Sequence, residues 1–375
     1  MTELPDRVAN LSPAQRLQLL HSLGGPPQRQ QTHPPPHPSQ WQNACLRIER
    51  PGNLESVRFQ AMESGPPGPG QIQVRAHAVS INFRDLMIAM GMYPPTPDVQ
   101  SVMGSDYAGE VIDCGPGVTD FSPGDRVMAL SVGHSEIDGS IRADSHFCAM
   151  PNLWAFQAMR IPANLNYVEA ASIPTAFLTA YYSLHHVARL AKGERVLIHS
   201  ATGGVGLSAI AIARWLGADI VGTAGSDTKR NYLRSIGIAE VYDSRTTAFA
   251  DIIEGGVDVI LNTLAGDAVA RGLGLLRPFG RFLQIDKHDI SMAGILPLAA
   301  FANGLSFTAI DLSLFLLRPK VISGLFEELA SHFQANRFRP TRTRIFPAHQ
   351  INTALHLMSS FRHIGKIVID YDQLS

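Results

Sequence analysis

The first part of the chain shows an alternation of apolar and polar residues. The clearest case is QIQVRAHAV at 71–79, where Ile72, Val74 and Ala76 alternate with polar neighbours. A period of two is typical of a strand with one face in the core. Short apolar runs between Gly- and Pro-rich turns predict further strands at 107–112 and 126–130. We therefore expect residues 41 to about 166 to be rich in β-structure.

The pattern changes near Val168, where short apolar runs begin to alternate with helical patterns. Four apolar residues from Val205 to Leu216 are spaced 4, 3 and 4 apart, on one face of a helix. Strands are predicted at 195–199, 219–224, 257–261 and 281–285, and helices at 205–216, 229–236 and 268–276. This order predicts right-handed βαβ units and a parallel sheet. After Phe307 mixed structure returns and ends in a strand at 366–370, so an α/β nucleotide-type unit is inserted into a β-rich one.

Residues 1–40 have a different composition. Ser12 before Pro13 predicts a helix start, and Gly24–Gln40 contains six prolines with almost nothing to bury. We interpret this stretch as an extended, flexible linker. The alternative is a polyproline segment that binds a partner.

Charge and cysteine content narrow the function classes. The 375 residues carry 31 Lys plus Arg against 32 Asp plus Glu, a net charge of −1, which argues against broad binding of nucleic acid or an anionic membrane. No apolar run is long enough for a membrane span, and the first residues lack a signal-peptide core. Cys45, Cys114 and Cys148 are scattered, so we expect isolated thiols in a cytoplasmic protein.

The candidate cofactor site is the segment VLIHSATGGVG at 196–206. Aligned to the fingerprint GxGxxG, it places Ala201, Gly203 and Gly206 at the three key positions. Gly203 permits close approach of a pyrophosphate, and Gly206 permits close packing of helix on strand. The predicted cofactor-binding residues here are Ala201, Thr202, Gly203, Gly204, Val205 and Gly206. A simple tight turn is the alternative, but the position between a strand and a helix favours dinucleotide binding.

The end of the next strand favours NADPH over NADH. An NAD site usually carries an acid about 20 residues after the glycines, whereas this chain has small residues there, ending in Ser226. Lys229 and Arg230 follow and can pair with a 2′-phosphate. Two alternatives stay open: the two cations lie on a solvated helix face, and Asp227 serves a ribose or caps the helix.

Several collinear stretches resemble the zinc-free medium-chain dehydrogenase/reductase superfamily, and more narrowly the enoyl reductase domains of modular (type I) polyketide synthases. They cover most of 41–370 and are INFRDLMIAMGMYP (81–94), GVTDFSPGDRVMAL (117–130), ASIPTAFLTAYYSL (171–184), SATGGVG (200–206), VDVILNTLAGD (257–267), GRFLQIDKHDI (280–290) and FRHIGKIVI (361–369). The resemblance implies a GroES-like substrate domain at 41–170 and 307–375, and a Rossmann NADPH-binding domain at 171–306. No metal is implied, because GSDYAGE at 104–110 lacks the His of zinc-dependent members.

The implied activity is NADPH-dependent reduction of an enoyl thioester held on an acyl carrier protein, during polyketide biosynthesis. Hydride goes to the β-carbon and a proton to the α-carbon. The partners implied are the carrier protein, with its phosphopantetheine arm, and neighbouring synthase domains. The resemblance equally fits a free-standing reductase and a domain tethered within a synthase.

The resemblance also implies roles for single residues. Lys287 matches a proposed proton donor or oxyanion partner, Asp311 the acid that acts with it, and Tyr93 a tyrosine associated with the stereochemistry of α-protonation. The alternatives are a structural ion pair for the first two and a cleft wall for the tyrosine. Further cofactor contacts are expected from Asn82, Thr179, Asn262 and Leu264.

Three stretches depart from the family pattern: 131–157, the IDKHD segment at 285–289, and the apolar run at 290–306. Because all three can border a substrate cleft, other outcomes stay open. One is closure of a cyclopropane from a halogenated enoyl thioester. Another is a zinc-free quinone or alkenal reductase, and a third, non-enzymatic one is an NADPH-binding structural partner.

Overall fold

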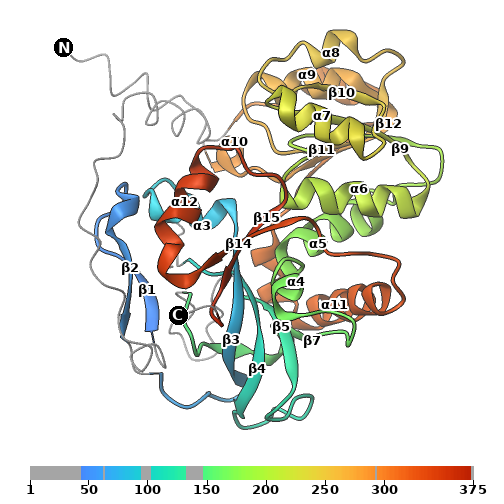
Figure 1. Cartoon of the computed structure of the whole chain (residues 1–375). Helices are drawn as coiled ribbons and strands as arrows, with labels where there is room; N and C mark the ends of the chain where they lie inside the picture. The colour runs from blue at the N-terminus through green and yellow to red at the C-terminus, as the bar shows by residue number, and fades with distance from the viewer. Residues whose placement is uncertain (1–43, 62–63, 94–102, 132–146, 292–293, 373–375) are drawn as a thin grey trace.

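Two large sheets lie beside each other in the computed structural model (Figure 1), which describes residues 44–61, 64–93, 103–131, 147–291 and 294–372. One sheet is parallel, and its strands come from the middle of the chain. The other sheet contains strands that precede this middle part in the sequence and strands that follow it. The predicted fold class, a Rossmann-type parallel sheet inserted into a β-rich GroES-like unit, is confirmed. The leader at 1–40, with its predicted helix, lies outside the described residues.

The β-rich unit is a sheet of seven strands in the order β14-β15-β3-β4-β5-β7, with β6 against β3. In β3 the alternating residues of the sequence pattern, Ile72, Val74 and Ala76, are buried. β15 pairs antiparallel with β3, so the last strand of the chain completes this sheet. The strand bounds are β3 (Gln71–Ile81), β4 (Asp106–Cys114), β5 (Arg126–Leu130), β6 (Asn152–Trp154), β7 (Ala158–Arg160), β14 (Thr343–Pro347) and β15 (Lys366–Asp370).

The parallel sheet has six strands in the order β10-β9-β8-β11-β12-β13. Its central strands are buried on both faces because helices cover them, which explains their continuous apolar runs. The elements are β8 (Arg195–Ile198), α6 (Gly204–Leu216), β9 (Asp219–Ala224), α7 (Asp227–Ser235), β10 (Glu240–Asp243), α8 (Phe249–Ile252), β11 (Val257–Asn262), α9 (Asp267–Leu275), β12 (Leu276–Gln284) and β13 (Ser306–Ala309). The proposed domain boundary at 306/307 falls within β13, and the domain bounds stay a prediction.

Helices join the two sheets. α5 (Pro174–Tyr181) packs against α6, and it continues into a π-helix, η4 (Tyr182–Val187). α11 (Pro319–Gln334) lies against α5 and β7 (Figure 1). The remaining elements are β1 (Ala44–Ile48), η2 (Leu54–Ser56), β2 (Val57–Ala61), α3 (Phe83–Ala89), η3 (Ala155–Gln157), α4 (Tyr167–Ala171), α10 (His288–Ser291), η5 (Leu298–Asn303), η6 (Leu312–Leu317), η7 (Ala348–Gln350) and α12 (Ile351–Ser359). In the described part of the chain, no helix is both long and apolar enough to cross a bilayer.

The expectation of isolated thiols is wrong for two of the three cysteines. Cys45 and Cys148 form a disulfide across a sequence separation of 103 residues, and both are buried. The fold brings them together because the Ala149 N–H donates to the Ala44 carbonyl of β1, at 2.9 Å. Spacing along the chain gives no hint of this pair. Cys114 is a free thiol, and burial raises its pKa.

Candidate active site

The loop between β8 and α6 has no space for a side chain at two of its three glycines. A Cβ on Gly206 would lie 2.6 Å from the backbone of Ala201, and one on Gly204 would lie 2.6 Å from the side chain of Lys366. Gly203 is the N-cap of α6 and places no side chain over the first helical amides. These amides and the helix dipole favour an anion. The loop Ala201–Gly206, which includes Val205 in the first turn of α6, therefore forms a cradle that fits the pyrophosphate of a dinucleotide.

Two hydrogen bonds hold this loop in position. The Gly365 N–H donates to the Thr202 carbonyl at 2.8 Å, and the Thr263 hydroxyl donates to Ser200 Oγ at 2.9 Å. The first bond comes from the segment before β15, and the second from the end of β11. The loop is thus tied to both sheets.

The two cations that were predicted to bind a 2′-phosphate, Lys229 and Arg230, have different surroundings. Arg230 forms ion pairs with Asp227 at 2.7 Å and Asp243 at 2.9 Å, and it donates to the Ala224 carbonyl at 3.0 Å. Its charge is therefore already balanced inside the fold. Lys229 is half-buried, and burial together with the nearby Arg245 lowers its pKa to about 8.

Arg245 is a cation that the sequence interpretation missed. Its Nε lies 3.3 Å from the point where a Cβ on Gly225 would be, at the end of β9. Ser226 caps α7 in the same turn, accepting a hydrogen bond from the Lys229 amide at 3.4 Å. Lys229 and Arg245 thus flank the small residues of this turn, whereas Arg230 stabilises the β9–α7–β10 unit.

A buried polar network lies on the other side of the loop. The Asp106 carboxylate accepts hydrogen bonds from Lys366 Nζ at 2.9 Å, Asn82 Nδ2 at 3.0 Å and the Thr175 hydroxyl at 2.5 Å. Lys366 Nζ also donates to Asn82 Oδ1 at 2.6 Å. Asn82 is therefore held by the fold on both sides of its amide, and a direct cofactor contact from it stays a prediction. Thr179 is buried on α5, one turn after Thr175.

Asn262 closes the turn at the carboxyl end of β11. Its side-chain amide donates to the Leu264 carbonyl at 2.7 Å and to Gln284 Oε1 at 2.6 Å, and its Oδ1 accepts the Leu264 N–H at 3.2 Å. Asn262 is fully buried. It therefore fixes the backbone of Leu264 at the edge where open parallel sheets bind their ligands.

The three predicted catalytic residues meet in one place. Lys287 Nζ lies 2.6 Å from Asp311 Oδ2 and donates to the Tyr93 hydroxyl at 3.4 Å. The lysine follows β12, the aspartate follows β13, and the tyrosine follows α3. Burial raises the pKa of the Asp311 carboxyl, but hydrogen bonds from Lys287 and Ser313 outweigh it, so the pKa lies below its ordinary value. Asp311 is therefore a carboxylate near neutral pH and holds Lys287 by charge. The side chains of Lys287 and Asp311 are 35% and 25% exposed, so solvent reaches the pair.

Two family models match the chain. The alcohol dehydrogenase GroES-like domain matches residues 68–172, and the model described as zinc-binding dehydrogenase matches residues 236–369. A phenolphthiocerol/phthiocerol polyketide synthase polypeptide of Mycobacterium tuberculosis is 40% identical over 334 residues, which cover 88% of this chain. The chain spans only 15% of the length of that relative.

Solved structures of polyketide enoyl reductases are also similar to this chain, and the matches cover almost the whole of those structures. The JamJ enoyl reductase is 30% identical with a TM-score of 0.80, and the match covers 88% of this chain and 99% of JamJ. The chain belongs to the enoyl reductase family of polyketide synthases. The CurF ER cyclopropanase from the curacin A biosynthetic pathway is also similar, at 28% identity and a TM-score of 0.78, with 88% of this chain and 99% of that one covered. This enoyl reductase homologue is thus an oxidoreductase of the medium-chain dehydrogenase/reductase superfamily.

The enoyl reductase homologue contains three site residues that the sequence interpretation passed over: Asp106, Lys366 and Arg245. A lone Lys at the start of the apolar run KIVID is an unusual strand residue, and it is only 4% exposed. That pattern could have marked Lys366 as the partner of a buried acid. The acid that pairs with it, Asp106, lies in the GSDYAGE segment, so an ammonium group faces the carboxylate there. The absence of a zinc ion at the positions that zinc-dependent members of the superfamily use stays a prediction.

Proposed function

We propose that this chain is an NADPH-dependent enoyl reductase that reduces the α,β-double bond of an enoyl thioester on an acyl carrier protein. The observation that carries the proposal is the contact of Lys287 with both Asp311 and Tyr93, at the carboxyl ends of β12 and β13. A charged donor held by a carboxylate is what a developing thioester oxyanion needs. Membership in the enoyl reductase family supports the reaction type.

NADPH is the proposed cofactor. The cradle from Ala201 to Gly206 fits a pyrophosphate because Gly203, at the N-cap of α6, leaves the first helical amides uncovered. Lys229 and Arg245 flank the small turn at Gly225, where a 2′-phosphate would lie next to a ribose. A reduced nicotinamide supplies a hydride when it is bound. Asn82, Thr179 and Leu264 are the proposed contacts on the nicotinamide side, and Asn262 fixes the backbone of Leu264.

The proposed partners follow from the relatives. The mycobacterial synthase polypeptide is much longer, and this chain matches a segment of it. An acyl carrier protein with its phosphopantetheine arm would present the substrate, and other synthase domains would make the enoyl group and use the product. We place this activity in the cytoplasm, where the Cys45–Cys148 disulfide would be kept from reductants by its burial.

The mechanism assigns each member of the cluster a task. An ammonium group has three N–H donors, and two of those on Lys287 have partners among the described residues, Asp311 and Tyr93. The third donates to the thioester oxygen of the substrate. As the β-carbon gains hydride, the electrons of the double bond move toward that oxygen, and the ammonium group stabilises the enolate.

Protonation completes the reaction. The α-carbon takes one proton, either from Lys287 directly or from water ordered by the Tyr93 hydroxyl, and the lysine regains its proton from solvent. The Asp311 carboxyl, whose pKa is held below its ordinary value by hydrogen bonds from Lys287 and Ser313, stays ionised and holds the lysine in place. The products are the saturated thioester and the oxidised cofactor. The hydride, with its two electrons, and the proton together account for the gain of two hydrogens.

The test is reduction of an enoyl-pantetheine thioester with NADPH carrying deuterium at the transferable position. We expect cofactor oxidation and a product with one deuterium on the β-carbon and one solvent hydrogen on the α-carbon. Oxidation of NADPH by a free quinone or alkenal, with none by the thioester, would instead support the quinone or alkenal reductase. No oxidation with any acceptor, but binding of NADPH, would support the structural partner.

Reductive cyclopropane formation is a second candidate, favoured by the similarity to the CurF ER cyclopropanase. In this reaction the same hydride addition gives an enolate, whose α-carbon displaces a halide from the γ-carbon instead of taking a proton. A halogenated enoyl-pantetheine thioester distinguishes the two. Halide release with ring closure supports this candidate, and a saturated product that keeps its halogen supports simple reduction.

A further inference from the structure

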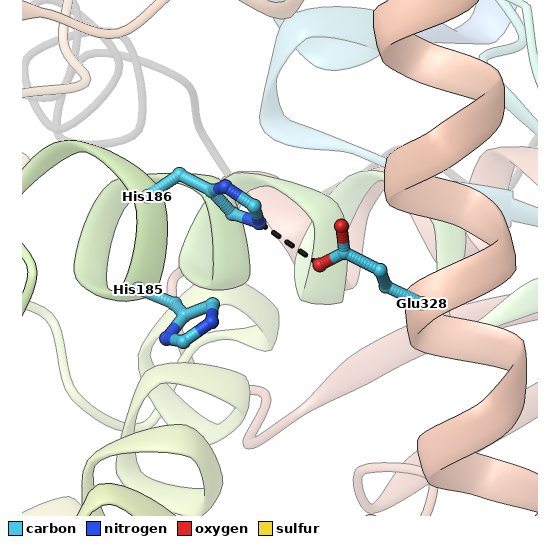
Figure 2. A group of neighbouring side chains, drawn as sticks. All are labelled: His185, His186 and Glu328. Atoms are coloured by element: carbon cyan, nitrogen blue, oxygen red, sulfur yellow. Dashed lines mark hydrogen bonds and ion pairs between the residues drawn. The ribbon is translucent and has the colours of Figure 1, made fainter.

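A cluster of metal-ligating side chains lies outside the proposed reduction site, between η4 and α11. His185 and His186 are consecutive residues of the π-helix η4, and Glu328 is on the facing helix α11 (Figure 2). His186 Nε2 lies 3.1 Å from Glu328 Oε2, and one ligand atom from each of the three residues lies within 4.8 Å of the others. Figure 2 shows both imidazoles on the side of η4 that faces the glutamate.

The π-helix explains why two consecutive histidines share this side. Its hydrogen bonds run from residue i to i+5, as in the bond from the Ala188 N–H to the Ser183 carbonyl at 2.9 Å. A wider turn places successive side chains at a smaller angle to each other than an α-helix does. The two rings accordingly lie with their centroids 5.0 Å apart.

Neighbouring side chains orient these ligands. The Tyr181 hydroxyl donates to Glu328 Oε2 at 2.9 Å, which fixes the carboxylate. The ring of His185 packs against Trp215, with centroids 5.3 Å apart. One turn along α11, the buried His332 lies 3.5 Å from the same tyrosine hydroxyl. Such a second layer of contacts is typical of metal sites, because it holds ligands in a binding geometry.

The donor set selects the kind of ion. Two imidazoles and one carboxylate suit Zn²⁺ and neighbouring transition metals, whereas Mg²⁺ and Ca²⁺ prefer oxygen ligands. Bonds of about 2.0–2.1 Å around a tetrahedral ion put ligand atoms roughly 3.3 Å apart. The 3.1 Å separation of His186 Nε2 and Glu328 Oε2 already meets this spacing, and a ring nitrogen of His185 lies within 4.8 Å of both.

We propose that His185, His186 and Glu328 bind a divalent transition-metal ion of the Zn²⁺ class. The side chains of His186 and Glu328 are 34% and 46% exposed, so the ion enters from solvent and completes its coordination with water. It joins η4 to α11. Because Tyr182 of η4 packs on Phe315, with centroids 4.8 Å apart, the ion also fastens the segment that follows Asp311. The ion takes no part in hydride transfer.

The test uses the full chain after removal of metals with a chelator. Calorimetric titration with Zn²⁺ and visible absorption with Co²⁺ are measured for the parent and for His186→Ala, Glu328→Gln and His356→Ala. The last variant is the matched control, because His356 also pairs with a surface carboxylate, Glu55, at 2.7 Å. Thermal unfolding without metal establishes that each variant is folded.

We expect the parent and His356→Ala to bind one Co²⁺ with visible absorption bands, and Zn²⁺ to raise their melting temperatures. His186→Ala and Glu328→Gln should each lose at least tenfold in affinity together with the stabilisation. Weaker additional sites that all four proteins share, beside the tight site of the parent, belong to other histidines among the 14 in the chain. Equal affinity in the parent and both site variants, or no binding by the parent, would overturn the proposal.

Discussion

The choice between NADPH and NADH is predicted to depend on Arg245 and Lys229, and not on Arg230. Replacing Arg245 with Ala removes a cation next to Gly225, where its Nε lies 3.3 Å from the position of an added Cβ. A hydrogen bond to a charged group contributes about 1.5–3 kcal/mol, which corresponds to roughly 10- to 150-fold in affinity. Because Arg245 is exposed, we expect the lower end of that range, and a larger loss for the half-buried Lys229.

Arg230→Ala is the matched control for this prediction. It breaks the ion pairs with Asp227 and Asp243 and the bond to the Ala224 carbonyl, so it should lower the melting temperature and affect both cofactors equally. The assay is KM for NADPH and for NADH, measured side by side for each variant. A selective loss of NADPH in Arg230→Ala, with none in Arg245→Ala, would refute this assignment of the phosphate site.

Three more outcomes are expected. Lys229, whose pKa is about 8, is charged below that pH, and the 2′-phosphate is fully ionised above about pH 7. KM for NADPH should therefore be flat between about pH 7 and 8 and rise above pH 8. KM for NADH should stay flat, and Lys229→Arg should remove the rise. Asp106→Asn leaves the buried Lys366 ammonium unpaired and should lower the free energy of unfolding in urea by about 3–5 kcal/mol; a change under about 1 kcal/mol would contradict the network. Gly206→Ala should lower the free energy of unfolding by about 1–3 kcal/mol and weaken cofactor binding, because its Cβ would lie 2.6 Å from the backbone of Ala201. Gly274→Ala is the control and should change neither quantity, because its Cβ would have no neighbouring atom within 4 Å.

The strands and helices around the cofactor loop could be predicted because local patterns determine them. Buried parallel strands give short apolar runs, and α6 shows its apolar face along the sequence and ends at Gly217, with φ of 75°. The loop Ala201–Gly206 followed from the same pattern. The edge strands β10 and β13 were missed, because each has four residues and only one or none of them buried.

The parts of the site that could not be predicted depend on contacts between distant segments. Arg245 reaches Gly225 only because β10 pairs with β9, and β10 has no clear strand pattern. Arg230 looked equivalent to Lys229 in sequence, but Asp243 from the next strand neutralises it. The disulfide at Cys45 likewise joins segments that no spacing rule connects. The meeting of Lys287 with Asp311 and Tyr93, in contrast, agrees with the family resemblance, although their catalytic roles stay proposals.

The most direct test of the account is the turnover number of Lys287→Ala with an enoyl-pantetheine thioester at saturating NADPH. The account predicts a fall of about 10²- to 10³-fold, because the donor to the enolate oxygen is lost. The dissociation constant of NADPH should stay unchanged, since Lys287 contacts Asp311 and Tyr93 rather than the cofactor cradle. A turnover number within twofold of the parent would contradict the role assigned to this lysine.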